Sequence, residues 1–126
     1  MRVLIVEDNA DLAAVWAGFL GRQGMVCTIA ATPDDAYAAL RASDFDALIL
    51  DMEVSESEAV AVADFATYRN PNIPIIAVTA RNFFSDGLLF QLIPNARGHL
   101  RRPLRLEDMA AIVEHYGSRT TASSRP

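Results

Sequence analysis

The sequence predicts one α/β domain with a five-stranded parallel sheet of order 2-1-3-4-5, doubly wound with five helices. Two observations favour this fold. Short runs rich in Val, Ile and Leu alternate five times with segments of helical periodicity, and parallel strands need such crossover connections. The chain has 126 residues, of which 52% are hydrophobic, enough for one compact domain with its own core. The pattern favours this strand order without establishing it.

Each predicted strand is a short apolar run flanked by turn residues, which is typical of strands buried on both faces of a parallel sheet. The first four runs are clear, and the fifth, around His99 and Leu100, is weaker. The clear runs cover residues 3–6, 26–30, 47–50 and 75–78.

Helical patterns fill the gaps between these runs. Apolar residues from Leu12 to Leu20 follow the spacing of a core-facing stripe, which Gly21 ends. Thr32 and Pro33 are typical of an N-cap and a first helical position. The other helices are predicted over residues 57–68, 83–92 and 106–116.

These elements are predicted to form one domain over residues 1–116. Residues 117–126 lack apolar anchors and are expected to be a disordered tail. Cys27 is the single cysteine, which favours a reducing compartment. The sequence shows neither a signal peptide nor an apolar run of the roughly 20 residues that a membrane helix needs. We therefore expect a cytoplasmic protein. Its formal net charge of −5 argues against direct nucleic-acid binding.

Acidic and hydroxyl side chains follow the strands at the edge where such a sheet binds ligands. Glu7 and Asp8 end the first strand, Asp51 ends the third, and Thr79 ends the fourth. Ligands of open parallel sheets bind at the carboxyl ends of the strands, so we expect these groups to converge. Like charges so close need a cation, and Mg²⁺ is the natural partner of oxygen ligands. A carboxylate beside Mg²⁺ can then attack phosphorus.

Each of these residues has a structural alternative. Glu7 and Asp8 could cap the following helix, a role that Asn9 or Asp11 could share. Thr79 could be a β-branched strand residue with no further role. Asp51 is harder to explain in this way, because an unpaired buried charge at the end of an apolar strand is costly.

Four segments carry a resemblance to a known family over about residues 2–116: VLIVEDN, LILD, IPIIAVTA and NARGHLRRPL. In this order and spacing they resemble the receiver domain of two-component response regulators. The first segment is similar to that family's acidic strand end, the second to its phospho-acceptor strand, and the third to the strand with its conserved hydroxyl. The resemblance implies the flavodoxin-like receiver fold.

The resemblance also implies roles for the site residues. Asp51 would accept a phosphoryl group from a histidine of a partner kinase or phosphotransfer protein. Glu7, Asp8, Asp51 and the backbone carbonyl of Glu53 would organise Mg²⁺. Thr79 would bond a phosphoryl oxygen and bias a two-state equilibrium that a downstream protein reads. Such a domain is a signalling module with at most weak self-dephosphorylation, not an enzyme.

The chain departs from the family in its final block and in one loop. Arg102, before Pro103, stands where the family has lysine. By spacing alone Arg101 is a rival, because the preceding stretch is one residue longer than usual, but the proline favours Arg102. His99 occupies the aromatic switch position, or is a strand-end histidine with no special role. The loop over residues 52–57 lacks the usual Met-Pro pair and carries extra acids.

The predicted helix over residues 83–92 is apolar around more of its circumference than one buried face requires. An exposed remainder would form a partner surface, or a homodimer contact together with the fifth strand. The residues concerned are Phe83, Phe84, Leu88, Leu89 and Phe90.

Several functions fit these observations unequally. The first is a stand-alone, phosphorylatable receiver that signals by docking to another protein. The second is a phosphorylation-independent pseudo-receiver, which Arg102 and His99 favour and the intact acids oppose. A phosphohydrolase of the haloacid dehalogenase type is only faintly indicated, since its nucleophile belongs on the first strand and Asp51 ends the third. A flavodoxin-like cofactor site is also weakly supported, because no glycine- or serine-rich loop follows the first strand.

Overall fold

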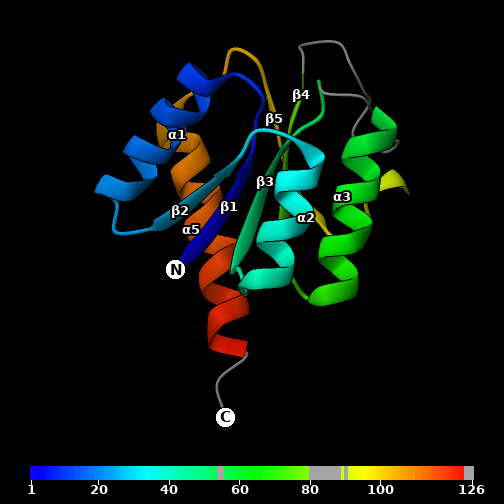
Figure 1. The fold of residues 1–126 in the computed structure, drawn as a ribbon. Helices are drawn as coiled ribbons and strands as arrows, with labels where there is room; N and C mark the ends of the chain where they lie inside the picture. The colour runs from blue at the N-terminus through cyan, green and yellow to red at the C-terminus, as the bar shows by residue number, and fades with distance from the viewer. Residues whose placement is uncertain (54–55, 80–88, 90, 124–126) are drawn as a thin grey trace.

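The computed structural model describes residues 1–53, 56–79, 89 and 91–123 (Figure 1). Within them, five parallel strands form one sheet in the predicted order, β2-β1-β3-β4-β5. This order brings β1 and β3 together at the centre, so residues that follow them lie side by side. The strands are β1 (Arg2–Val6), β2 (Val26–Ala30), β3 (Ala47–Asp51), β4 (Ile75–Thr79) and β5 (Ala96–Arg101).

Helices cover both faces of the sheet (Figure 1). Helices α1 (Ala10–Arg22) and α5 (Leu106–Ser123) pack on one face, and α2 (Pro33–Ala42) and α3 (Glu56–Arg69) on the other. The fourth expected helix, over residues 83–92, lies mostly outside the described residues, so the partner surface assigned to it stays a prediction.

The starts of α1 and α2 are fixed by side chains that the sequence indicates. The carboxamide oxygen of Asn9 accepts a hydrogen bond from the N–H of Leu12 at 3.0 Å. The hydroxyl of Thr32 accepts one from the N–H of Asp35 at 3.1 Å. Each cap satisfies an N–H that a helix end would otherwise leave unpaired. The sequence offered capping of this helix as an alternative role for Glu7 and Asp8. In the structure, Asn9 is the residue that caps it.

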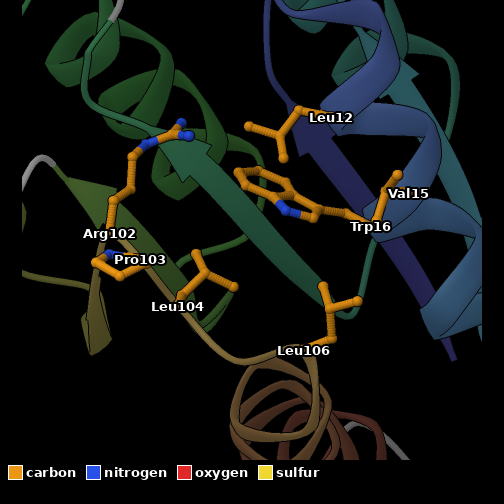
Figure 2. Close-up of a pocket in the computed structure, with 7 residues that line it drawn as sticks. All are labelled: Leu12, Val15, Trp16, Arg102, Pro103, Leu104 and Leu106. Carbon is orange, nitrogen blue, oxygen red and sulfur yellow. The ribbon is translucent and has the colours of Figure 1, made fainter.

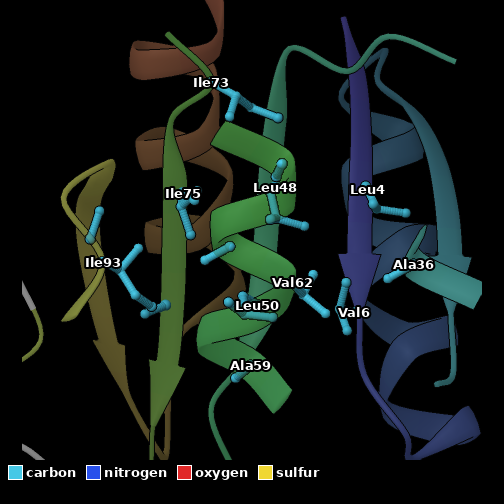
Figure 3. Close-up of a cluster of buried hydrophobic side chains, with 14 of the residues drawn as sticks. Leu4, Val6, Ala36, Leu48, Leu50, Ala59, Val62, Ile73, Ile75 and Ile93 are labelled. Carbon is cyan, nitrogen blue, oxygen red and sulfur yellow. The ribbon is translucent and has the colours of Figure 1, made fainter. Parts of the chain in front are cut away.

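Alternate residues of each strand enter two separate cores. Leu4, Leu48 and Leu50 pack toward α2 and α3 (Figure 3), whereas Ile5 and Ile49 pack toward α1 and α5. Successive side chains of a strand point to opposite faces. Ile5 and Ile49 have odd numbers, so by the same alternation Glu7 and Asp51 also belong to the α1–α5 side of the sheet.

Strand β2 corrects one expectation. It was predicted to be buried on both faces, but Val26 is 59% exposed and Ile29 is 43% exposed. The reason is its position, since β2 is an edge strand that pairs only with β1. An apolar run does not reveal by itself whether its strand is central or peripheral.

Helix α5 runs past the expected domain boundary at Tyr116. It continues to Ser123, and Gly117 is buried within it. A Cβ at Gly117 would lie 2.7 Å from the sulfur of Met1, so this part of the helix packs closely on the start of β1. The structure thus gives helical backbone to most of the segment that was expected to be a disordered tail. No helix in the described part of the chain combines the length and apolarity needed to cross a bilayer.

Strand β5 contains one more residue than its partner. Ile75 pairs with Ala96 but the next residue, Ile76, pairs with Gly98, so Arg97 is an extra residue in a β-bulge. After the bulge the pairing is regular, and Leu100 enters the core of α1 and α5. By strand alternation the side chain of Arg102, two residues after Leu100, belongs to that same side.

A carboxylate cluster bridged by an arginine

Three carboxylates meet at the carboxyl edge of the sheet, as the sequence predicts. Glu7, Asp8 and Asp51 each offer an oxygen, and these oxygens all lie within 4.8 Å of one another. Glu7 is 1% exposed and Asp51 is 2% exposed, while Asp8 is open to solvent. The cluster is therefore buried on two sides and reachable from solvent through Asp8.

The backbone of the sheet fixes this convergence. The N–H of Glu7 donates to the carbonyl of Ala30 at 3.1 Å, which extends the pairing of β1 by one residue. The N–H of Met52 donates to the carbonyl of Val78 at 2.9 Å and does the same for β3. Because β1 and β3 are neighbours in register, their ends deliver Glu7 and Asp51 to the same place.

One oxygen of each buried carboxylate is held by a backbone N–H. Oε1 of Glu7 accepts from the N–H of Asn9 at 3.0 Å, and Oδ1 of Asp51 accepts from the N–H of Glu53 at 2.9 Å. The second oxygen of each carboxylate is directed to Arg102. Its Nη2 donates to Oε2 of Glu7 at 3.1 Å and to Oδ2 of Asp51 at 3.0 Å.

Arg102 has a third acidic partner. Its Nε lies 3.0 Å from Oε2 of Glu53, an ion-pair contact in which the N–H does not point at the oxygen well enough for a hydrogen bond. The backbone N–H of Arg102 donates to the carbonyl of Thr79 at 2.9 Å and so fixes the start of its side chain beside β4. One guanidinium therefore links residues that follow β1 and β3.

The arginine also packs on an aromatic ring. Its guanidinium carbon lies 5.7 Å from the centre of the Trp16 ring, within the range of a cation–π contact. Figure 2 shows both side chains lining a mainly apolar groove of about 540 Å³ between α1 and the segment that joins β5 to α5. The other lining residues are Leu12, Val15, Pro103, Leu104 and Leu106.

The electrostatic setting of Glu7 is unusual. Burial raises the pKa of its carboxyl to about 8, and the hydrogen bond with Asp51 acts in the same direction. The N–H of Asn9 opposes this change, because it stabilises the charged form. The pKa of Glu7 therefore lies well above its ordinary value in the site without metal.

Arg102 stays charged in this setting. Burial alone lowers the pKa of its guanidinium, but the charges of Asp51, Glu53 and Glu7 outweigh it and raise the pKa above the ordinary value. The cluster therefore contains a permanent cation of its own.

Thr79 and His99 form a separate pair on the opposite face of the sheet edge. The hydroxyl oxygen of Thr79 lies 2.6 Å from Nε2 of His99, and Thr79 is fully buried. Thr79 pairs with Arg101 in the ladder, so His99, two residues earlier on β5, shares its face. The residue expected to bond a phosphoryl oxygen and the residue expected to act as a switch are thus in direct contact.

The structure also separates the two rival arginines. Arg102 contacts the acids, whereas Arg101 is exposed. Sequence reasoning missed the side-chain roles of Glu53 and Trp16, having assigned the first through its carbonyl and the second to packing. The available signal was position, because Glu53 follows Asp51 by two residues and Trp16 lies on the core-facing stripe of α1.

The donor set fits a divalent cation. Glu7, Asp8 and Asp51 supply only carboxylate oxygens, the ligands that hard ions such as Mg²⁺ prefer. The solvent-exposed Asp8 leaves room for the waters that Mg²⁺ retains. Within the described residues, the Arg102 side chain contacts Oε2 of Glu7 and Oδ2 of Asp51 and would compete with an ion for these oxygens.

The fold and the site together define a doubly wound α/β protein with an acidic ligand site at the carboxyl edge of its central strands. The family model of the response regulator receiver domain matches residues 3–114. The chain therefore belongs to the receiver domain family of two-component response regulators. Receiver domains are signalling domains that bind Mg²⁺ at an acidic pocket and interact with histidine kinases or phosphotransfer proteins.

Curated relatives are longer proteins. The chain is 24% identical over 124 residues to the DNA-binding transcriptional regulator NtrC of Salmonella typhimurium, covering 98% of this chain and 26% of the relative. It is 27% identical over 124 residues to the transcriptional regulatory protein PmrA of Pectobacterium parmentieri, covering 98% of this chain and 55% of the relative. The chain thus spans about a quarter to a half of the length of these relatives.

Solved structures show the same fold. A CheY-like receiver domain protein from Methanospirillum hungatei superposes with a TM-score of 0.84 at 21% identity and covers 98% of both chains. The receiver domain of a LuxO repressor-like protein from Vibrio parahaemolyticus gives a TM-score of 0.83 at 24% identity, covering 97% of this chain and 93% of its own.

Proposed function

We propose that this domain accepts a phosphoryl group on Asp51 from a phosphohistidine of a kinase or phosphotransfer protein, and that its output is a contact with another protein. The observation that carries the proposal is the position of Asp51. Its carboxylate is buried at the end of β3, beside two further carboxylates and a cation. A charge so placed is costly in a purely structural role.

The transfer is a displacement at phosphorus. A carboxylate oxygen of Asp51 forms the new P–O bond while the P–N bond of the donor phosphohistidine breaks, and the imidazole leaves with the bonding electron pair and takes up a proton. The N–H of Glu53 holds Oδ1 of Asp51 and so orients the carboxylate. Without metal, Arg102 supplies positive charge at Oδ2 of Asp51. Once it has left that oxygen, its guanidinium fork can hold a phosphoryl oxygen.

Glu7, Asp8 and Asp51, with the backbone carbonyl of Glu53, would hold Mg²⁺. The bound ion would supply charge neutralisation for the phosphoryl oxygens. Thr79 would bond one of those oxygens, and its present partner His99 would follow the change on β5.

The test measures covalent phosphorylation of the chain. The full chain is incubated with Mg²⁺ and a small acyl phosphate or phosphoramidate, and its intact mass is recorded. We expect a gain of one phosphoryl group that Asp51→Asn abolishes. Asp44→Asn, at an exposed position upstream of β3, is the matched control and should retain the gain. Equal labelling of the Asp51→Asn variant would contradict the proposal.

A second candidate is a phosphorylation-independent receiver that acts only as a binding module. The direct contact of Arg102 with Oδ2 of Asp51 favours it, because this oxygen is already occupied by a cation. Absence of any mass gain in the native chain, with both donors and saturating Mg²⁺, would favour this second function.

A further inference from the structure

Arg102 occupies the place between two oxygens that a metal ion would use. A single nitrogen, Nη2, lies 3.1 Å from Oε2 of Glu7 and 3.0 Å from Oδ2 of Asp51. Both carboxylates belong to the cluster whose oxygens converge within 4.8 Å. The guanidinium therefore neutralises the cluster by the same contacts through which a divalent cation would do so.

Two side chains hold the guanidinium in this position. Glu53 pairs with its Nε at 3.0 Å from the solvent side, and the Trp16 ring lies at 5.7 Å from its central carbon. Trp16 is 1% exposed, so a buried ring lies against the guanidinium, while the Arg102 side chain remains 26% exposed. An arginine side chain that contacts three acids and an aromatic face is pre-organised, unlike a lysine on a flexible stem.

A guanidinium and a divalent cation repel each other strongly at such distances, because both are positive and partly removed from water. Asp8 is the member of the cluster that is open to solvent, and so offers the first ligand to an entering ion. To reach the buried oxygens of Glu7 and Asp51, the ion has to replace Nη2.

We propose that Arg102 is a built-in counter-ion that Mg²⁺ must displace from Glu7 and Asp51, and that Glu53 and Trp16 are positioning residues that keep it there. This inference rests on the metal site of the proposed function but does not require phosphoryl transfer. It makes metal binding an exchange of cations. Metal occupancy is thereby coupled to the position of a side chain that lines the groove beside α1.

The first experiment is a calorimetric Mg²⁺ titration of the full chain, at fixed pH and ionic strength. Arg102→Gln is expected to bind Mg²⁺ about tenfold more tightly than the native chain, because the competing charge is gone. Arg101→Gln is the matched control, since it removes the same charge at an adjacent, exposed position. Its affinity should rise by less than about threefold, because exposed charges are screened. An unchanged or weaker affinity in Arg102→Gln, or an equal rise in Arg101→Gln, would overturn the proposal.

The second experiment uses the native chain and so does not depend on the folding of a variant. Trp16 is the single tryptophan and lies against the guanidinium, so its emission is expected to change when Arg102 moves. Mg²⁺ is expected to change this emission with the same dissociation constant that calorimetry gives. Calorimetric binding of Mg²⁺ without any change in the emission of Trp16 would mean that Arg102 stays in place. That result would contradict the proposal.

The positioning role of Glu53 has its own readout. In the metal-free protein, Glu53→Gln should move the emission of Trp16 toward that of Arg102→Gln, and Glu53→Asp should restore the native spectrum. A native spectrum in Glu53→Gln would remove Glu53 from the proposal. None of these readouts involves phosphate, so a chain that exchanges Arg102 for Mg²⁺ but never gains a phosphoryl group would contradict only the proposed function.

Discussion

The hydroxyl oxygen of Thr79 lies 2.6 Å from Nε2 of His99, and this contact joins the last residue of β4 to the middle of β5. Strand β5 is the edge strand on this side of the sheet, and β4 lies between it and β3. The pair therefore forms a side-chain link between the end of β4, the neighbour of the strand that ends at Asp51, and the edge strand β5.

Thr79→Val should weaken the fold by removing this link. The variant keeps the β-branched shape but loses the hydroxyl, which costs about 1 kcal/mol of unfolding free energy. Urea unfolding monitored by circular dichroism measures the change. Thr79→Ser keeps the hydroxyl and serves as the control for the hydrogen bond. If both variants lose the same free energy, the hydrogen bond does not contribute.

Glu7→Gln should change the pH dependence of stability. Burial raises the pKa of Glu7 to about 8 from 4.5, so between these values the folded protein retains a proton that the unfolded chain has released. The contribution of this group is complete below about pH 4.5 and is lost as pH rises toward 8. In metal-free buffer, we expect Glu7→Gln to gain on the order of 2 kcal/mol relative to the native chain between these limits.

Urea unfolding at a series of pH values checks this expectation. Glu58→Gln, at an exposed position of α3, is the control for loss of one carboxylate. A native chain whose stability rises across this window relative to Glu7→Gln would show that Glu7 is ionised in the folded protein.

Gly98→Ala should destabilise the domain by about 1–3 kcal/mol, as overpacking of a close contact does. A Cβ at Gly98 would lie 2.7 Å from Cγ2 of Ile112 on α5, so either the Ile112 side chain or the packing of β5 on α5 would have to shift. Gly21→Ala is the control, because a Cβ there meets nothing within 4 Å. It lies in α1 and should stabilise by up to about 1 kcal/mol. Thermal unfolding of both variants tests the contrast, and equal effects would contradict it.

Arg102→Lys tests the arginine under the proposed phosphoryl transfer. The ammonium keeps the charge but cannot reach Glu7, Asp51 and Glu53 together. Phosphoryl gain on Asp51 should become at least about threefold faster as its oxygen is released, while unfolding free energy changes by less than about 1 kcal/mol. Time-resolved intact-mass measurement follows the gain. Unchanged kinetics would mean that Arg102 does not limit access to Asp51.

The sheet could be predicted from the sequence because buried parallel strands leave a strong apolar signal. The pattern favoured the strand order without establishing it, and the structure confirms that order. The convergence of Glu7, Asp8 and Asp51 follows from the same reasoning, since each lies at a strand end. The exposure of β2 could not be predicted, because an edge strand and a central strand have the same local pattern.

The choice of Arg102 over Arg101 was predicted from the proline that follows it, and the structure places the extra residue of the preceding stretch in the bulge at Arg97. The individual contacts of Arg102 could not be predicted, because residue types do not show where in β5 the extra residue lies. The side-chain role of Glu53 depends in turn on where Arg102 lies. Long-range ion pairs of this kind follow from register, which local patterns do not encode.

The bulge on β5 has a consequence for insertions and deletions. Arg97 is the residue by which β5 exceeds its partner, so a chain shortened by this one residue could pair Ile75 and Ile76 regularly and leave everything downstream unmoved. An insertion after Gly98 would instead turn the following residues over and move Arg101 into the position beside the carboxylates that Arg102 now holds. A change in length by one residue is thus tolerated at the bulge of β5. After Gly98, the same change decides which arginine contacts the carboxylates.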